Sequence, residues 1–145
     1  MEENLLWNQI SNNLGLVEYL SISSSLDRAF IPVFISWPQE IRILDSDWFT
    51  LENLLSCTCS EITLEESLLE NKDFDGVLRK WKTGGFPNLK RLWLDSPNIT
   101  DNGEQILGMN LNELDFMVIK TDDGSKKATI YIRPAGIEVF ATPFD

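Results

Sequence analysis

Apolar residues recur along the chain in one frame: an apolar residue, two residues, an apolar residue, one residue, and a third apolar residue. The stretch LKRLWL, residues 89–94, is its clearest instance. Five stretches follow the frame, and their middle residues, Leu20, Ile41, Ile62, Leu92 and Leu114, are spaced by 21, 21, 30 and 22 positions. Leucine-rich repeats have roughly 20–29 residues per turn. The pattern therefore predicts five short strands stacked as turns of a solenoid.

Apolar residues at helical spacing lie between the predicted strands. Residues 45–56 and 71–85 each place apolar residues on one helical face behind a capping candidate, and Gly84 is the stop signal of the second helix. Residues 100–109 are expected to form a shorter helix or a turn. Because each helix follows one strand and precedes the next, we expect parallel strands with the helices packed on one side.

The period of the pattern falls to about two residues after Met117. This alternation predicts strands at about 114–120, 128–133 and 137–141, joined by the turn formers DDGS and RPAG. Such hairpins would cover the apolar flank of the last repeat. The predicted fold is α/β, a single domain over residues 1–145. A short leucine-rich-repeat-like arc of parallel strands and helices, about 15–117, is closed by a C-terminal antiparallel hairpin cap, about 114–142.

Charge and composition narrow the possible partners. Twelve basic and 23 acidic residues give a net charge of −11, which repels nucleic-acid phosphates and anionic membranes. No stretch approaches the roughly 20 apolar residues of a membrane span, and the first residues lack the pattern of a secretory signal. We therefore expect an intracellular protein, cytoplasmic or nuclear, that binds neither nucleic acid nor membrane. Cys57 and Cys59 are expected to be reduced and semi-buried.

The sequence contains few residues and motifs suited to catalysis. It contains no histidine, which excludes a Ser-His or Cys-His couple and a histidine metal ligand. It also lacks the glycine-rich motifs that cradle phosphate. Three acidic pairs remain as candidates for acid–base work or cation binding, although the last of them is more typical of a hairpin turn. These pairs are Asp45 with Asp47, Glu65 with Glu66, and Asp122 with Asp123. We predict no catalytic residue, no metal site, no cofactor and no enzyme activity.

The exposed strand face is the expected place for protein recognition. In the repeating frame the leucines point inward, so the residues between them point outward. Trp93, flanked by Arg91 and Asp95, has the composition of an interface hot spot. The alternative is that Trp93 packs under the C-terminal hairpin. The candidate partner-binding residues are Tyr19, Arg42, Arg91, Trp93, Asp95, Asp115 and Met117.

The segment before the second strand has an apolar run broken by a proline. Phe30, Ile31, Val33, Phe34 and Ile35 are too irregular for a buried helix and too apolar for an ordinary exposed loop. We expect this run to pack against the first repeat. The alternative is a partner-binding patch, because large exposed apolar areas mark interaction sites.

Several stretches resemble the nematode F-box associated domain, type 2. LENKDFDGVLRKWKTGGFPNLKRLWL, residues 69–94, is similar to the central block of that family, and Trp81, Gly84 and Pro87 are its most telling matches. WFTLENLLS upstream and DDGSKKATIYI downstream are similar to two further segments of the family. The resemblance extends over about residues 15–142. Phe74 and Asp75 stand where the family has Leu-Asn, and the chain lacks the family's aromatic ending.

The resemblance implies a protein-recognition function. In the family, an F-box joins the protein to the ubiquitin ligase scaffold, and the associated domain holds the protein to be modified. The chain would then recognise a ubiquitination substrate. No F-box is found in residues 1–13, so binding to the Skp adaptor would need an F-box that this chain does not contain. The alternative is a scaffold or inhibitory interaction domain that acts without ubiquitin ligase and self-associates through Phe30 to Phe34 or the hairpin edge.

Overall fold

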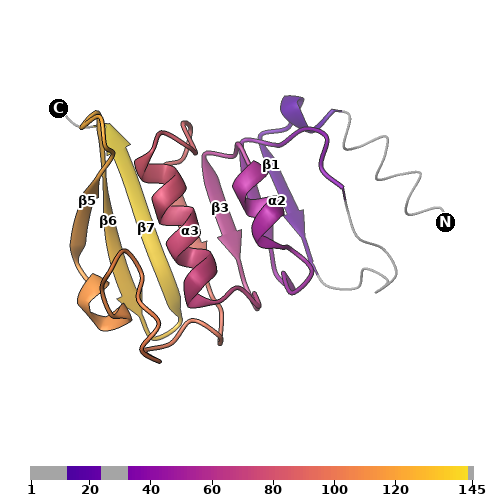
Figure 1. Cartoon of the computed structure of the whole chain (residues 1–145). Helices are drawn as coiled ribbons and strands as arrows, with labels where there is room; N and C mark the ends of the chain where they lie inside the picture. The colour runs from indigo at the N-terminus through magenta and orange to yellow at the C-terminus, as the bar shows by residue number, and fades with distance from the viewer. Residues whose placement is uncertain (1–12, 24–32, 144–145) are drawn as a thin grey trace.

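A computed structural model describes residues 13–23 and 33–143 of the chain. Its described part is a mixed α/β domain built on one seven-stranded sheet with the strand order β1-β2-β3-β4-β7-β6-β5 (Figure 1). The first four strands in this order are parallel to one another, and the last three are antiparallel to their neighbours. The mixed α/β fold expected from the sequence is therefore confirmed.

Four of the five predicted strands form the parallel half of the sheet. They are β1 (Tyr19–Ile22), β2 (Glu40–Ile43), β3 (Glu61–Leu64) and β4 (Arg91–Leu94). The middle residues of the sequence frame lie side by side, because Leu20 pairs with Ile41, Ile41 with Ile62, and Ile62 with Leu92. The alignment follows from burial, since a slip of one residue would turn every apolar side chain of a strand to water.

The prediction of a fifth strand around Leu114 is wrong. Residues Leu111–Leu114 form a short 3-10 helix, η2, and Phe116 has a φ of 63°. Leu111 and Leu114 are buried as the frame requires, but on a helical turn. Apolar residues three positions apart lie on one face of a helical turn, and the repeating frame has the same spacing. The spacing alone therefore does not distinguish a helical turn from a strand. A second 3-10 turn, η1 (Leu14–Leu16), precedes β1 and buries Leu14.

Two helices cover one face of the sheet (Figure 1). Helix α2 (Leu51–Ser56) begins where the Thr50 side chain accepts a hydrogen bond from the Asn53 amide at 3.2 Å. Helix α3 (Asn71–Lys82) begins with a reciprocal capping pair formed by Glu70 and Asp73. It ends before Gly84, whose φ of 100° suits the expected stop signal. The predicted third element, residues 100–109, has a turn closed by Ile106 and Met109 and no helix.

The C-terminal hairpins complete the sheet. Strands β5 (Met117–Lys120), β6 (Lys126–Arg133) and β7 (Gly136–Pro143) pair antiparallel, and β7 also pairs with β4. The chain thus places its last strand between β4 and β6. Strand β7 removes the free edge that β4 would otherwise expose, which is the capping role expected for these hairpins. Each strand begins or ends within a few residues of its predicted bounds.

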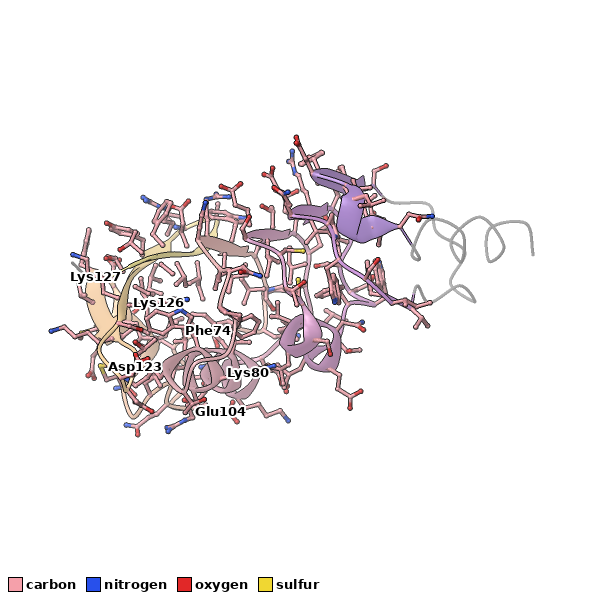
Figure 2. The ribbon with its side chains drawn as sticks, turned by 90° about the horizontal axis from the view of Figure 1, so that it is seen from above. Phe74, Lys80, Glu104, Asp123, Lys126 and Lys127 are labelled. Carbon is pink, nitrogen blue, oxygen red and sulfur yellow. The ribbon has the colours of Figure 1, made fainter. Side chains whose placement is uncertain are left out.

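A row of buried apolar side chains runs across the sheet on the helix-covered side. Its members lie next to one another on adjacent strands and are Ile41, Ile62, Leu92, Val139 and Ile130. Figure 2, seen from above, shows both helices on this side of the sheet and Phe74 of α3 pointing toward it. Phe74 is fully buried in the core between helix and sheet. The opposite face carries no helix from residues 13–23 and 33–143 and is called the open face below.

Candidate functional site

The open face of the parallel strands has a shallow hollow of about 370 Å³. Its side chains alternate with the buried row along each strand, so the sequence frame alone directs them outward. Four of the seven predicted binding residues, Tyr19, Arg42, Arg91 and Trp93, lie there together. The hollow is lined by Tyr19, Glu40, Arg42, Thr63, Glu65, Arg91 and Trp93.

Arg91 and Arg133 on the open face both pair with the carboxylate of Glu138. Arg91 Nε lies 2.9 Å from Glu138 Oε2, and Arg133 Nε lies 3.1 Å from Glu138 Oε1. Glu138 is 8% exposed, so its charge is compensated by both guanidinium groups as a buried carboxylate requires. Arg42 and Glu65 form a looser pair at 3.7 Å and are more accessible. Arg91 is therefore held more tightly at the hollow than Arg42 is.

Two carboxyl groups lie next to each other at the beginning of β2 and β3. Glu40 of β2 and Glu61 of β3 are register partners, and Glu40 lines the hollow. A hydrogen bond with Glu61, together with burial and repulsion between the two, raises the pKa of Glu40, while Arg91 opposes the rise. Like charges on neighbouring strands destabilise a sheet. This pair of acids therefore does not stabilise the fold.

Trp93 packs against the C-terminal hairpin, as one of the two alternatives for this residue expected. It pairs with Glu138 of β7 and lies against Gly136 at the start of the same hairpin strand, so closely that a Cβ at Gly136 would be 2.9 Å from its ring. The side chain is half-buried, and its remaining surface lines the hollow. The C-terminal hairpin thus sets the position of Trp93, and its binding role stays a prediction.

Three of the predicted binding residues do not belong to the hollow. Met117 packs against the core, because Phe116 at positive φ shifts the alternation and places Met117 on the same side as buried Ile119. Asp115 accepts a hydrogen bond from the Ile132 amide at 2.9 Å, and Asp95 accepts one from the Glu66 amide at 3.4 Å. The outward placement expected for Met117 is wrong, and both aspartates contact backbone.

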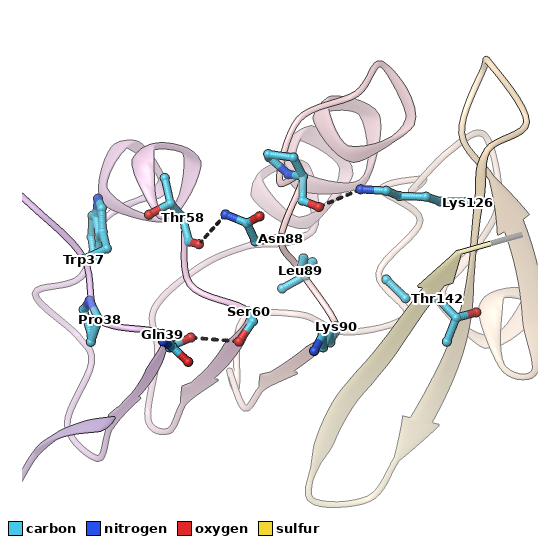
Figure 3. A pocket seen from close by; sticks show the side chains of 12 residues that line it. Trp37, Pro38, Gln39, Thr58, Ser60, Asn88, Leu89, Lys90, Lys126 and Thr142 are labelled. Atoms are coloured by element: carbon cyan, nitrogen blue, oxygen red, sulfur yellow. Dashed lines mark hydrogen bonds between the residues drawn. The ribbon is translucent and has the colours of Figure 1, made fainter. Parts of the chain in front are cut away.

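A larger cleft of about 520 Å³ lies where the loops before β2, β3 and β4 meet the end of β7 (Figure 3). Sequence reasoning missed it, because loops distant in the sequence form it. Its polar side chains bond to neighbouring loops: Asn88 Nδ2 to the Thr58 carbonyl at 3.3 Å, Ser60 Oγ to the Gln39 carbonyl at 3.0 Å, and Lys126 Nζ to the Pro87 carbonyl at 2.6 Å. These hydrogen bonds hold the loops together, so the polar groups that make them are already used within the fold. For this reason we consider the open-face hollow the better candidate for the recognition site.

The apolar segment before β2 is partly packed and partly exposed. Phe34 stacks on Trp37 with ring centroids 4.1 Å apart and meets Phe49 edge-on at 6.0 Å, which confirms the expected packing for this residue. Val33 and Ile35 are 67% and 66% exposed. Phe30 and Ile31 lie outside the described residues. The aromatic cluster fixes the loop at the beginning of β2.

The remaining candidates behave as structural groups. Asp123 accepts hydrogen bonds from Ser125 and Thr121 in the β5–β6 turn, and the Ser125 bonds lower its pKa to about 2. Asp45 raises the pKa of Glu66 through a hydrogen bond at the opposite end of the parallel strands. Cys57 and Cys59 are free thiols, more deeply buried than expected. Within residues 13–23 and 33–143, no cluster of three or more His, Cys, Asp or Glu is placed to hold a metal ion.

The fold and the open face define a mixed α/β domain whose sheet is covered by helices on one side and presents a hollowed polar and aromatic face on the other. No helix in the described part of the chain is long and apolar enough to cross a membrane. Residues 30–94, which include β2, β3, β4 and both helices, match the family model described as F-box associated. This segment is similar to the F-box associated family, and the likeness expected from the sequence is confirmed over these residues.

The match to the F-box associated family model implies protein partners. No curated protein and no solved structure matches the chain. The nematode origin implied by the sequence resemblance stays a prediction. The matched segment carries most of the hollow, since Glu40, Arg42, Thr63, Glu65, Arg91 and Trp93 all fall within residues 30–94.

Proposed function

We propose that this protein is the substrate-recognition part of an F-box type ubiquitin ligase and binds its protein partner at the open-face hollow. The observation that carries the proposal is the hollow itself. Tyr19, Arg42 and Trp93 converge there from three different strands, on the face that no helix covers. Aromatic and arginine side chains at the centre of a concave surface are typical of interface hot spots.

The electrostatics of the hollow support binding to a protein. Glu40 and Glu61 repel each other in the unbound protein, so a partner that supplies a donor or a cation between them relieves an existing strain. The ion pair between Arg42 and Glu65 is accessible enough to exchange for contacts with the partner. Polar groups of this kind give specificity more than affinity.

The proposal includes no chemistry on the bound protein by this domain. The absence of histidine and of phosphate-binding glycine motifs supports a non-enzymatic role. We place the protein inside the cell, in the cytoplasm or nucleus, where ubiquitin ligases act. The spacing of β1 to β4 supports a relationship to leucine-rich repeats, which we retain as a proposal about the origin of the parallel half.

The experiment compares affinity capture by the wild-type protein and by the double variant Tyr19→Ser, Arg42→Ala. Both residues are exposed, so their replacement removes binding groups with little effect on unfolding. Alanine at Trp93 or Arg91 is a poorer choice, because these side chains contact Gly136 and Glu138. The matched control is Lys72→Ala, Arg79→Ala on the exposed side of α3.

We expect a set of proteins retained by the wild type and the control to be lost from the hollow variant. If these are ubiquitination substrates, their half-life in cells should lengthen when the variant replaces the wild-type protein. Equal capture by the hollow variant would show that another surface binds. Unchanged half-lives of the captured proteins would instead favour a scaffold without ubiquitin ligase.

A further inference from the structure

The cleft of about 520 Å³ at the beginning of the parallel strands differs in charge from the chain as a whole. The chain has 23 acidic and 12 basic residues, so acids outnumber bases by almost two to one. Among the described residues that line the cleft, the charged side chains are two lysines, Lys90 and Lys126, and there is no acid. This cleft is called the basic cleft below.

The charges of both lysines are available to a ligand. Lys90 is exposed and Lys126 is partly exposed. Within residues 13–23 and 33–143, neither amine forms an ion pair with a carboxylate within 4.0 Å. Lys126 Nζ donates to the neutral Pro87 carbonyl at 2.6 Å, which uses one of its three donor protons. The attraction between Lys126 and Asp123 contributes less to the pKa of Asp123 than the Ser125 hydrogen bonds do.

Two acids that are close to the basic cleft in the sequence face the other side of the sheet. Glu40 and Glu61 directly follow Gln39 and Ser60, which line the cleft. Because successive side chains on a strand alternate, these two carboxylates point to the open face, where Glu40 lines the hollow. The basic cleft and the open-face hollow share no lining residue. They are therefore separate sites of different charge.

Trp37 forms the end of the basic cleft at β2. Phe34 stacks on its ring with centroids 4.1 Å apart and an interplanar angle of 11°, and Phe49 meets it edge-on at 6.2 Å. One face of the half-buried indole is thus covered, and the rest lines the cleft together with Pro38 and Pro87. An aromatic ring held in this way binds an apolar side chain at a low cost in conformational entropy.

The basic cleft is elongated across the ends of the strands. Trp37 comes just before β2 and Lys126 begins β6, and Lys90, just before β4, lies between them (Figure 3). The strand order β2-β3-β4-β7-β6 puts four steps between the two ends. At about 4.8 Å per step the span is about 19 Å, which an extended segment of about seven residues covers. This shape fits a polypeptide segment better than a compact small molecule.

Hydrogen bonds between backbone groups fix the shape of the basic cleft. The Ser60 and Glu61 amides both donate to the Gln39 carbonyl, at 2.7 and 3.3 Å. The Lys90 amide donates to the Ser60 carbonyl at 2.7 Å, and the Ala141 amide donates to the Lys90 carbonyl at 2.9 Å. These bonds do not use the Lys90 amine. A cleft that exists before binding loses little entropy when a ligand enters.

We propose that the basic cleft binds an acidic, extended peptide segment of a partner protein. An apolar side chain of the segment contacts Trp37, and two carboxylates pair with Lys90 and Lys126. Two strand steps separate Trp37 from Lys90, and two more separate Lys90 from Lys126. Two steps of about 4.8 Å match about three residues of an extended chain, so the apolar residue and the two acids follow one another at intervals of about three.

A short peptide suits the basic cleft better than a nucleic acid or a membrane does. Both of these are extended polyanions, and the net charge of −11 repels them over their whole length. A segment with two acids contacts the cleft alone, and at physiological ionic strength a Debye length of about 8 Å screens the more distant acids of the domain. Because ion pairs with exposed lysines are weak, we expect reversible binding that high salt reduces.

The basic cleft is independent of the proposed function, since it lies at the strand ends and not on the open face. A partner that carries an acidic segment beside the surface bound at the hollow would contact the domain at two places. The second contact is then intramolecular, which raises the overall affinity without any change at the hollow.

The experiment selects peptides from a random heptapeptide library displayed on phage, with the purified full chain as the target. The cleft variant is Lys90→Gln, Lys126→Gln, which removes both charges and keeps polar side chains. The matched control is Lys72→Gln, Arg79→Gln, which makes the same change in net charge at exposed positions of α3 outside the cleft. Urea unfolding of each variant shows whether it is folded.

We expect the selected peptides to carry an apolar residue and two acids at intervals of about three, in either direction along the peptide. A labelled synthetic copy of the most enriched peptide should bind the control as it binds the wild type. Its dissociation constant for the cleft variant should be at least about tenfold higher. Lys90→Gln alone should raise the constant at least about threefold. The Lys90 side chain makes no hydrogen bond within the described residues, so this single variant tests the site even if the double variant unfolds.

Selection of acidic peptides, with loss in the cleft variants and not in the control, supports the proposal. A library that yields no binder overturns it, as do selected peptides without paired acids or equal binding by the cleft variants. The hollow variant Tyr19→Ser, Arg42→Ala should bind the peptide like the wild type, and a loss there would move the peptide to the hollow and overturn the proposal. None of these outcomes measures capture at the hollow, so their failure leaves the proposed function standing.

Discussion

Trp93 shows how a single side chain of the open face is set by residues far away in the sequence. It is half-buried because Gly136, at the start of β7, lets the hairpin backbone come against the indole ring. The exposed remainder of the ring lines the hollow. At the residue scale, the shape of the hollow therefore depends on a glycine that does not line it.

Gly136→Ala should destabilise the protein by about 1–3 kcal/mol, the usual cost of overpacking a tight contact. The added Cβ would lie 2.9 Å from the Trp93 ring and 3.0 Å from the Leu94 carbonyl, so either the ring or β7 must move. Urea unfolding measures the loss, and the emission of tryptophan reports the shift. Gly76→Ala is the control, since a Cβ there meets nothing within 4 Å. Equal stability of the Gly136 variant and wild type would contradict the packing described here.

Helix α3 is the element that joins the sheet to the long connection after β4. Asn71, in its first turn, is fully buried. Its Nδ2 donates to the carbonyls of Thr100 at 2.7 Å and Glu104 at 3.0 Å, and its Oδ1 accepts from the Thr100 amide at 3.0 Å. One side chain thus satisfies several backbone groups of a segment without regular structure.

Asn71→Ala should lower the free energy of unfolding by about 2–3 kcal/mol, because it leaves buried donors and acceptors of the connection unpaired. Asn98→Ala is the matched control. Asn98 is exposed and its side chain donates to the Leu68 carbonyl, so its removal should cost less than about 1 kcal/mol. Thermal or urea unfolding distinguishes the two. Similar losses in both variants would show that the Asn71 bonds do not stabilise the connection.

The β5–β6 hairpin should open in acid. Hydrogen bonds from Ser125 and Thr121 lower the pKa of Asp123 to about 2, against an ordinary value of 3.8. Since the folded pKa lies below the unfolded one, the ionised carboxylate favours the turn. Its contribution is complete well above pH 4 and is lost as the pH falls from about 4 to 2. The protection factor of the Ser125 amide, which is the measured exchange rate by NMR relative to the intrinsic rate at the same pH, should fall over this range, and Asp123→Ala should remove this fall. A protection factor that still falls with pH in that variant would assign the effect to another acid.

At the scale of the whole molecule, one core joins the parallel and antiparallel halves. Buried residues from β2, β3, β4, β6, β7 and both helices form a single hydrophobic cluster. Cys57 and Cys59 lie within it, and a hydrogen bond from the Cys59 thiol to Cys57, together with burial, raises the pKa of Cys59. A thiol that is both buried and protonated is unreactive until the surrounding structure opens.

Labelling of the two cysteines should therefore report on global unfolding. The chain contains no other cysteine, so the reaction with a chromogenic disulfide reagent at pH 8 counts these two alone. We expect no fast reaction in the native protein and two thiols per chain in urea. The labelling rate should rise with urea along the unfolding curve. Rapid labelling of native protein would mean that the edge of the core near β3 opens by itself.

The sequence by itself determined the parallel strands, both helices, the hairpin positions and the outward placement of Tyr19, Arg42, Arg91 and Trp93. Each of these depends on local periodicity, because alternation along a strand decides which side chains face the core. The same pattern misplaced Met117 and mistook the turn at Leu111–Leu114 for a strand. Phe116 at positive φ breaks the alternation there, and no spacing of apolar residues records a backbone dihedral.

Only the tertiary structure decided the order of the strands and everything that depends on it. Strand β7 pairs with β4, so Glu138 meets Arg91 and Gly136 meets Trp93 across more than forty residues of sequence. That same order puts β4 in the middle of the sheet. Strand pairing is a contact between distant segments, and its free energy depends on which edges remain to be satisfied. Local patterns therefore predict the strands, and the assembled sheet decides which charges become neighbours.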